Sequence, residues 1–333
     1  MAKEREKWAE FGWQGIRLRV PEEWNLGRVD GDRDSGYVRL DDAEIVRAEI
    51  EWRTVKGQVD GSVSTLVDRY IENLEKKAKK GDIPFSVQRR AKFLGDKRWL
   101  EGRDYETFTW EADFRAFNLA IRTDKSRILL LRILTRLDEK PGGHVEAIFS
   151  SLEDRFQDEA WFWSVYGLAF LMPADFKLES HELKSGHIQL SFEKEKEVCR
   201  VHRLSLAQLL LKERELGDWY PVFFKKQLKD FDVETVTEAV GGHPGLRVTG
   251  KPRSRWRQLL RPLPMVNPRP RQFMDSRVWN CRETNKICVV DHLFRKKEQQ
   301  GDLAERIADG YFCHQKSAET EPRDHAELAA GSQ

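Results

Sequence analysis

The sequence predicts an α+β protein built from two tandem repeats, each an antiparallel β-sheet flanked by helices in an α/β/α layered arrangement. Three observations support this prediction: an internal repeat, strand periodicity interrupted by one helical stripe in each copy, and a length of 333 residues. At about 150 residues per domain, that length corresponds to two domains. We expect repeat 1 at 1–152, a linker at 153–160, repeat 2 at 161–314 and a disordered tail at 315–333.

The repeat is visible as two pairs of similar segments. GIRLRVPEEWNL, residues 15–26, returns as GLAFLMPADFKL, residues 167–178, with the glycine, proline, aromatic and leucine positions matched. SGYVRL at 35–40 then returns as SGHIQL at 185–190, two residues closer. This period is far longer than the roughly 20–50 residues of solenoid repeats. It indicates a duplicated domain and predicts a pseudo-dimer within one chain.

The composition is that of folded globular domains. Charged residues make up 34% of the chain, aromatic residues 11%, and eleven residues are tryptophan, whereas disordered chains are poor in aromatics. A net charge of +2 gives no general attraction to nucleic acid or membranes. No apolar run reaches signal-peptide or membrane-spanning length, and four cysteines without an export signal favour reduced thiols. We therefore expect a cytoplasmic protein without membrane insertion.

Alternating strands open each copy, because apolar residues fall on every second position and bury one face. Pro21 and Pro173 end the first strand of each copy, since proline has no N–H to donate to a strand ladder. The strands are predicted at 16–20 and 46–52 in the first copy, and at 168–172 and 199–201 in the second.

A helix follows these strands in each copy. In the first, apolar residues recur with helical spacing over 63–74, which predicts one buried stripe. Ser62 can cap this helix, and a lysine-rich end leads to Gly81 as the stop. In the second copy a weaker stripe predicts one helix over 216–228.

Each copy then ends with a β-hairpin, introduced by a glycine turn, and a short closing helix. The hairpin strands are predicted at 117–122 and 127–134 in the first copy and at 279–282 and 287–294 in the second. The closing helices are predicted at 145–152 and 303–311.

The strand that ends in Val20-Pro21-Glu22-Glu23-Trp24, the order of elements and the glycine turn before the late strands resemble the PsbP-like family. This family includes the photosystem II extrinsic subunit P and the Ran-binding Mog protein. The second copy departs from the motif, with Phe176 at the tryptophan position. The resemblance covers both repeats and implies non-catalytic binding modules.

Thiols and imidazoles gather around the second hairpin. If this hairpin turns at Thr284-Asn285, Cys281 lies opposite Cys288, Trp279 opposite Val290, and Arg277 opposite His292. The residues from which a metal site could then be drawn are Cys281, Cys288, His292, Cys313 and His314. In the first copy, however, Ile121 and Ile128 match the two hairpin cysteines. Positions that accept isoleucine are core positions, so we expect cysteines packed as small hydrophobes and no metal.

Two further polar groups have simpler explanations than a binding site. Asp275, Arg277 and His292 share a predicted face and could form a polar site, but we expect the solvated end of a sheet with charges paired among themselves. The segment Asp30–Gly36 has carboxylates at alternate positions, as calcium loops do. Because Ser35 stands where such a loop needs glycine, a polar turn is expected.

A basic segment distinguishes the second copy from the first. No acidic residue occurs between Ala239 and Met274, and we expect an inserted loop at 247–271. The expected binding residues are Arg253, Arg255, Trp256, Arg257, Arg261, Arg269 and Arg271. Arginines interleaved with an aromatic residue and prolines suit phosphate contact or base stacking, and equally docking on an acidic protein partner. They could also pair with acids of their own chain.

The familiar catalytic motifs GxGxxG, HExxH and GxSxG are missing from the sequence. Gly245–Lys251 spells GxxxxGK, but Pro252 stands where a P-loop needs Ser or Thr, so a chance match is expected. We therefore expect no enzyme, no catalytic residue and no cofactor. The leading hypothesis is a non-catalytic protein-interaction or assembly module with a protein partner of unknown identity. The alternative is nucleic-acid or polyanion binding through the arginine-rich loop, and an undetected hydrolase or metal enzyme ranks third.

Overall fold

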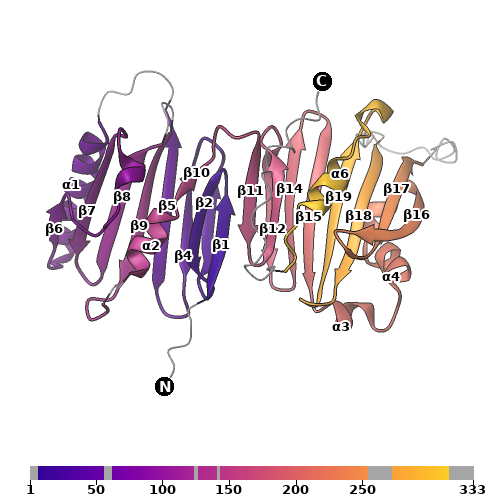
Figure 1. Cartoon of the computed structure of the whole chain (residues 1–333), viewed down its shortest axis with the longest axis horizontal. Helices are drawn as coiled ribbons and strands as arrows, with labels where there is room; N and C mark the ends of the chain where they lie inside the picture. Colours follow the sequence, from indigo (N-terminus) through magenta and orange to yellow (C-terminus); the bar gives the residue numbers. More distant parts are fainter. Residues whose placement is uncertain (1–6, 56–61, 124–126, 141–142, 254–271, 315–333) are drawn as a thin grey trace. The chain divides into compact units, whose positions relative to one another are not determined.

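Two compact units make up the chain. The first unit comprises Met1–Gln157 with Ser164–Tyr166, and the second comprises Asp158–Trp163 with Gly167–Gln333. The computed structural model describes residues 7–55, 62–123, 127–140, 143–253 and 272–314 (Figure 1). Antiparallel strands dominate both units and a few helices accompany them, in agreement with the predicted α+β class.

A seven-stranded antiparallel sheet forms the centre of the first unit, in the order β3-β4-β5-β9-β8-β7-β6. Its strands are β3 (Asn25–Gly31), β4 (Ser35–Asp41), β5 (Val46–Thr54), β6 (Ser86–Arg89), β7 (Tyr105–Glu111), β8 (Arg115–Arg122) and β9 (Arg127–Thr135). Three more strands pair beside it: β1 (Trp8–Trp13), β2 (Ile16–Pro21) and β10 (Glu153–Asp154). The helices are α1 (Val63–Gly81), η1 (Arg98–Leu100) and α2 (His144–Ser150).

The second unit also has a seven-stranded antiparallel sheet, in the order β13-β14-β15-β19-β18-β17-β16. Its strands are β13 (Lys177–Lys184), β14 (His187–Lys194), β15 (Glu197–Ser205), β16 (Phe231–Val240), β17 (His243–Pro252), β18 (Phe273–Cys281) and β19 (Lys286–Phe294). The strands β11 (Ala160–Val165) and β12 (Leu168–Pro173) precede it. The helices are α3 (Ala207–Leu211), α4 (Leu216–Phe223), α5 (Lys225–Leu228), η3 (Lys297–Gln299) and α6 (Leu303–Asp309).

The two sheets share one strand order, and their first turns have the same hydrogen bond. The backbone N–H of Trp24 donates to the carbonyl of Pro21 at 3.0 Å, and that of Phe176 donates to Pro173 at 3.0 Å. Each proline is the last residue of its strand, and the next strand begins one residue after the aromatic. The proline-to-aromatic segment is therefore the same tight turn in both units.

The α1 helix is amphipathic, and its buried side chains Val63, Val67 and Ile71 pack with Phe108 of β7 and Ala120 of β8. At its N-terminus, the side chain of Ser62 accepts a hydrogen bond from the backbone N–H of Thr65. At its C-terminus, Gly81 is the last helical residue and Asp82 adopts a left-handed conformation. The sequence predicted both the cap and the end of this helix.

Because the Ser62 hydroxyl accepts a hydrogen bond from an N–H of the first helical turn, Ser62→Ala should lower the free energy of unfolding by about 1 kcal/mol. Urea denaturation monitored by far-UV circular dichroism measures this change. Lys77→Ala, at an exposed position of the same helix, is the control and should cost nothing. Equal stabilities of the Ser62→Ala variant and the parent would contradict the capping role.

The helical segment of the second unit differs from its prediction. Instead of one helix over 216–228, α4 and α5 meet at Phe224, whose φ of −92° and ψ of 19° are not helical. Pro221 lies inside α4 and cannot donate an N–H to the preceding turn, which weakens a continuous helix. The short helix α3, directly after β15, was not predicted.

The register of the second hairpin also corrects the prediction. Cys281 lies opposite Lys286, Trp279 opposite Cys288, and Arg277 opposite Val290. The strands are joined by the four residues 282–285, with Asn285 at a positive φ of 53°, rather than by a two-residue turn. The register therefore shifts by two positions, which preserves the predicted faces but changes every cross-strand partner.

The predicted linker at 153–160 contains ordered pairing. Glu153 and Asp154 form β10, which lies antiparallel to β2. The tail predicted at 315–333 lies outside the described residues, and so do residues 254–271 of the predicted basic loop. Residues 247–252, which were predicted as the start of that loop, instead form the end of β17.

Candidate functional site

Among the predicted binding arginines, Arg253 is the one that the structure describes. Its guanidinium lies 2.9 Å from the carboxylate of Asp232 and donates to the carbonyl of Lys229 at 3.2 Å. The other predicted residues, Arg255, Trp256, Arg257, Arg261, Arg269 and Arg271, lie outside the described residues. Binding through this loop therefore stays a prediction, and Arg253 itself pairs with an acid of its own chain.

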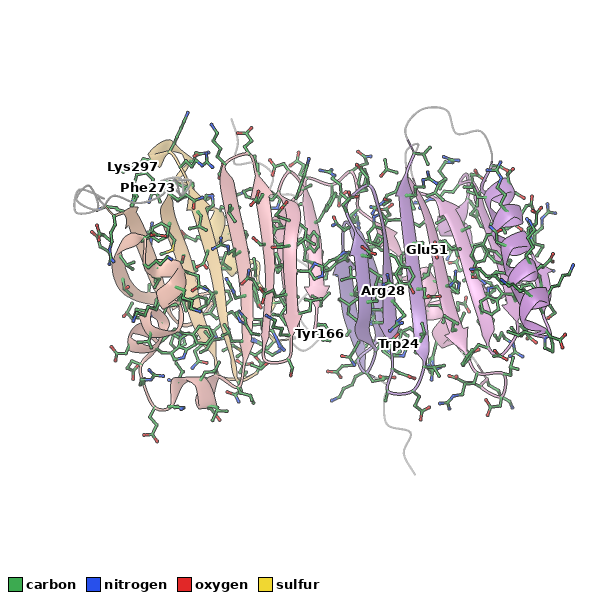
Figure 2. All side chains as sticks on the ribbon, turned by 180° about the vertical axis from the view of Figure 1, so that it is seen from behind. Trp24, Arg28, Glu51, Tyr166, Phe273 and Lys297 are labelled. Atoms are coloured by element: carbon green, nitrogen blue, oxygen red, sulfur yellow. The ribbon has the colours of Figure 1, made fainter. Side chains whose placement is uncertain are left out.

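The described part of the segment between β17 and β18 ends at an aromatic contact. Phe273, the first residue of β18, stacks on Phe294 at the end of β19, with ring centroids 5.8 Å apart. Figure 2 shows Phe273 and Lys297, in η3, at the same end of this sheet. Arg253, before residues 254–271, and Phe273, after them, are therefore both held by contacts within the second unit.

A long open edge strand is the most distinctive surface of the second unit. β16 is the last strand of its sheet and pairs with β17 over all ten of its residues. Residues 232–237 are exposed, including Val233 and, at 58%, Val236. Within the described residues, no further strand pairs with its outer side.

The other edges of the two large sheets differ from β16. β3 and β13 each contain a bulge, at Leu26/Arg28 and Leu178/Ser180, and β6 has only four residues. Short strands and bulges are common ways to keep an edge from pairing with another chain. β16 lacks both, and its ladder with β17 shows no register shift.

Exposed apolar side chains also gather in the helical segment between β15 and β16. Leu206 and Leu209 are 56% and 64% exposed, and Val222 and Phe223 on α4 are 61% and 41% exposed. Phe223 stacks on buried Trp219 with centroids 4.7 Å apart, so its exposed ring is held in place. In a chain this rich in charge, a run of exposed apolar residues is typical of a contact surface.

Beneath α4 lies a buried polar group that extends across the sheet. The hydroxyl of Tyr220 donates to Asp291 on β19 at 3.4 Å, and the Nε2 of His202 lies 3.4 Å from the same carboxylate. The other ring nitrogen of His202, Nδ1, lies 3.1 Å from the Nε2 of His187. His187 contacts Phe223 edge to face, so this chain of polar groups reaches the exposed apolar segment.

The electrostatics of these polar groups follow from burial and from their neighbours. Burial by itself would raise the pKa of Asp291, but the adjacent His202 and Ser276 outweigh it and lower that pKa. Burial and then the charge of His202 lower the pKa of His187 to about 4. Burial raises the pKa of Tyr220 well above its ordinary value. At neutral pH, Asp291 is therefore ionised, and His187 and Tyr220 are neutral.

The first unit has a base at the sheet position where the second unit has the acid Asp291. Arg132 on β9 lies opposite Glu49 on β5 and forms an ion pair with it, and its guanidinium lies over the ring of Tyr70 from α1. In the second unit, Asp291 on β19 lies opposite Arg200 on β15. The buried acid of one sheet thus corresponds to a base in the other.

Asp275, Arg277 and His292 are buried rather than solvated, which corrects the prediction. Arg277 is 3% exposed and lies 2.6 Å from Asp275, 3.0 Å from Glu305 and 3.3 Å from Glu238. His292 lies 2.8 Å from the carboxylate of Glu197. These charges are paired as predicted, but inside the unit, where they tie α6 and the strands together.

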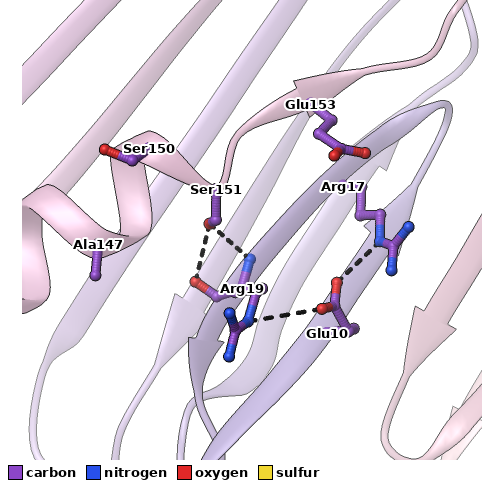
Figure 3. Close-up of a pocket in the computed structure, with 7 residues that line it drawn as sticks. All are labelled: Glu10, Arg17, Arg19, Ala147, Ser150, Ser151 and Glu153. Atoms are coloured by element: carbon purple, nitrogen blue, oxygen red, sulfur yellow. Dashed lines mark hydrogen bonds and ion pairs between the residues drawn. The ribbon is translucent and has the colours of Figure 1, made fainter. Parts of the chain in front are cut away.

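A cavity of about 360 Å³ lies between β1, β2 and α2 of the first unit (Figure 3). Glu10 lies 2.9 Å from Arg17 and 3.7 Å from Arg19, so it forms an ion pair with each of them. The hydroxyl of Ser151 accepts a hydrogen bond from the backbone of Arg19 at 2.9 Å. The polar side chains that line this cavity thus pair with one another or with the backbone.

The structure regroups the predicted thiols and imidazoles. Cys281, Cys313 and His314 meet, as the sequence allowed, but their fourth neighbour is His243 from the start of β17. Cys288 and His292, which the sequence placed with them, lie elsewhere: Cys288 opposite Trp279 and His292 beside Glu197. The sequence did not point to His243, because only the pairing of β17 with β18 brings this residue to the thiols. These two strands are separated in the sequence by the long segment 254–271.

Comparison with known proteins gives fold-level similarity alone. No family model and no curated protein matches the chain. The solution structure of cyanobacterial PsbP (CyanoP) from Synechocystis sp. PCC 6803 is 11% identical, with a TM-score of 0.33 over 46% of this chain and 96% of that chain.

The immunity protein TplEi of the T6SS from Pseudomonas aeruginosa is similar over most of the chain. Its complex with "L" peptide is 12% identical, with a TM-score of 0.37 over 91% of this chain and 97% of that chain. Its apo structure is 12% identical, with a TM-score of 0.33 over 92% and 97%. Among the described residues, no helix is both long and apolar enough to cross a membrane.

Proposed function

We propose that the chain is a non-catalytic protein-interaction module made of two copies of one α/β/α domain, at 1–152 and 161–314. Its partner supplies an extended segment that pairs with β16 as an additional strand. The observation that carries this proposal is the open edge of β16, which is long, regular and exposed. The shared strand order of the two sheets supports the duplication.

Backbone hydrogen bonds would provide most of the affinity in this mode of binding, because an edge strand presents a row of unpaired N–H and C=O groups. The acids of β16 do not oppose it. Glu234 lies 3.3 Å from Lys251, and Asp232 and Glu238 likewise face arginines of their own unit. The strand therefore carries little uncompensated charge, and Val233 and Val236 add apolar contact.

A matched pair of variants tests this proposal. Val233→Lys/Val236→Lys should weaken partner binding at least tenfold, since two lysines on an edge strand oppose further pairing. The fold should be retained, because both side chains are exposed. Leu137→Lys, at a 46% exposed position of the first unit, is the control and should bind normally.

The measurement is affinity purification from native lysate with the three baits, with and without nuclease, followed by hydrogen exchange of the recovered complex. Protection of the β16 amides by the partner is the expected result. Equal capture by all three baits, with protection at another strand, would refute β16 as the site. Loss of capture after nuclease treatment would instead favour the alternative hypothesis, nucleic-acid binding through the loop at 247–271.

A further inference from the structure

Two thiols and two imidazoles converge at one end of the second sheet. His243, Cys281, Cys313 and His314 each offer one ligand atom, and these atoms all lie within 4.8 Å of one another. The Nε2 of His243 lies 3.0 Å from the Sγ of Cys313. The Nδ1 of His314 lies 3.3 Å from Cys313 and 3.7 Å from Cys281.

Three separate segments bring these ligands together. Gly241 and Gly242, both at positive φ, make the tight turn that places His243 at the start of β17. The pairing of Gly245 with Trp279, continued by two residues, sets His243 opposite Cys281 at the end of β18. Cys313 and His314 follow α6. The site is therefore built by the sheet ladder and closed by the chain beyond the last helix.

We propose that these four residues bind one structural zinc ion. A tetrahedral zinc with ligands at about 2.0–2.3 Å separates its ligand atoms by about 3.3–3.8 Å, and three of the ligand-atom pairs here lie 3.0, 3.3 and 3.7 Å apart. Two thiolates balance the charge of Zn²⁺, so the loaded site is neutral and suits its partial burial. Four protein ligands leave no open position for substrate, which makes the site structural rather than catalytic.

The surroundings of the ligands fit this assignment. The Nε2 of His314, which faces away from the thiols, lies 3.5 Å from the carboxylate of Glu283. Metal-bound histidines commonly donate their second ring N–H to such a carboxylate, which fixes the ring. The hydroxyl of Thr284 donates to the sulfur of Cys281 at 3.1 Å, an arrangement that stabilises a thiolate.

At the corresponding place in the first unit, an ion pair connects the sheet to the segment after its last helix. Counted from the strand starts, Thr123 stands where Cys281 stands, and Asp154 follows α2 as closely as Cys313 follows α6. Asp154 accepts a hydrogen bond from Thr123 and lies 2.9 Å from Arg127. In the second unit the thiols and imidazoles replace this ion pair. A metal ion would supply the missing connection between the sheet and the segment after its last helix.

The test uses the full-length chain, purified under reducing conditions without chelator. Elemental analysis should find about one zinc per chain. Cobalt added to chelator-treated protein should give the visible bands of a tetrahedral site with thiolate ligands. Cys281→Ser/Cys313→Ser should abolish these bands. The control Cys199→Ala, at a buried cysteine outside the cluster, should keep them.

The Glu283→Gln variant separates loss of zinc binding from loss of folding. Glu283 is 66% exposed and supplies no ligand, so this variant should fold and bind zinc about tenfold or more weakly. Folded wild-type chain that takes up neither zinc nor cobalt would overturn the proposal. So would a disulfide between Cys281 and Cys313 in the reduced preparation, or unchanged cobalt bands in the double serine variant. None of these outcomes depends on partner binding.

Discussion

Replacing Arg127 with methionine should destabilise the first unit by about 3–5 kcal/mol. The side chains of Arg127 and Asp154 are 0% and 2% exposed and lie 2.9 Å apart. Arg127 also donates to the carbonyl of Gln14 at 3.0 Å and lies over the ring of Phe156 at 4.6 Å. Removing the guanidinium takes a counter-charge away from a buried carboxylate, which is among the costliest single changes in a protein interior.

Urea denaturation of the full chain, with hydrogen exchange of β8 and β9 as a local measurement, gives the change in stability. Arg127→Met/Asp154→Leu should recover most of the loss, because the second substitution also removes the buried carboxylate that Arg127 neutralises. Arg155→Ala removes an exposed pair with Glu153 and should cost at most about 1 kcal/mol. A single Arg127→Met variant as stable as the parent would show that the buried pair contributes nothing.

Acidification from pH 6.5 to pH 4 should selectively weaken the second unit. The pKa of His187 is lowered to about 4 in the folded protein from an ordinary 6.5. Between these values the unfolded chain binds a proton that the folded chain does not, so stability falls as the pH drops and stops falling below pH 4. Allowing for its partial exposure, His187 alone should cost about 1–2 kcal/mol.

His292 and His181 act in the same direction, since burial lowers the pKa of each, although Glu197 partly opposes this for His292. His187→Asn should reduce the slope of stability against pH in this window, as measured by urea denaturation at several pH values in chelator-treated chain. The chelator separates this effect from acid release of a metal ion. An unchanged slope in the variant, or an NMR titration of His187 near pH 6.5, would contradict the argument.

The sequence predicted secondary structure correctly where the spacing of apolar residues determines it. The stripe at 63–74 with Ser62 and Gly81 predicted α1, and the alternation on both sides of the first hairpin turn predicted β8 and β9. The second hairpin shows the limit of this approach. A two-residue and a four-residue turn place the same side chains on the same face, so the apolar pattern was correct while the partner of Cys281 was wrong.

The candidate sites could be predicted only in part. Cys281, Cys313 and His314 were recognised as possible ligands, but the comparison with Ile121 and Ile128 dismissed them. Counted from the first residues of β9 and β19, Cys288 matches Leu129 rather than Ile128. His243 could not be found from spacing, because strand pairing brings it to Cys281. The open edge of β16 depends on the strand order of the whole sheet, which no local pattern contains.

The inverted charges in the centres of the two sheets have a consequence for folding. Two sheets of one strand order within a single chain invite strands to enter the wrong sheet during synthesis. If β19 paired with β5, Asp291 would face Glu49. If β9 paired with β15, Arg132 would face Arg200. Like charges directly opposite one another destabilise a ladder, and here they would also be largely buried. We therefore expect the reversed charges to disfavour these wrong pairings, so that each central strand pairs with its own partner during folding.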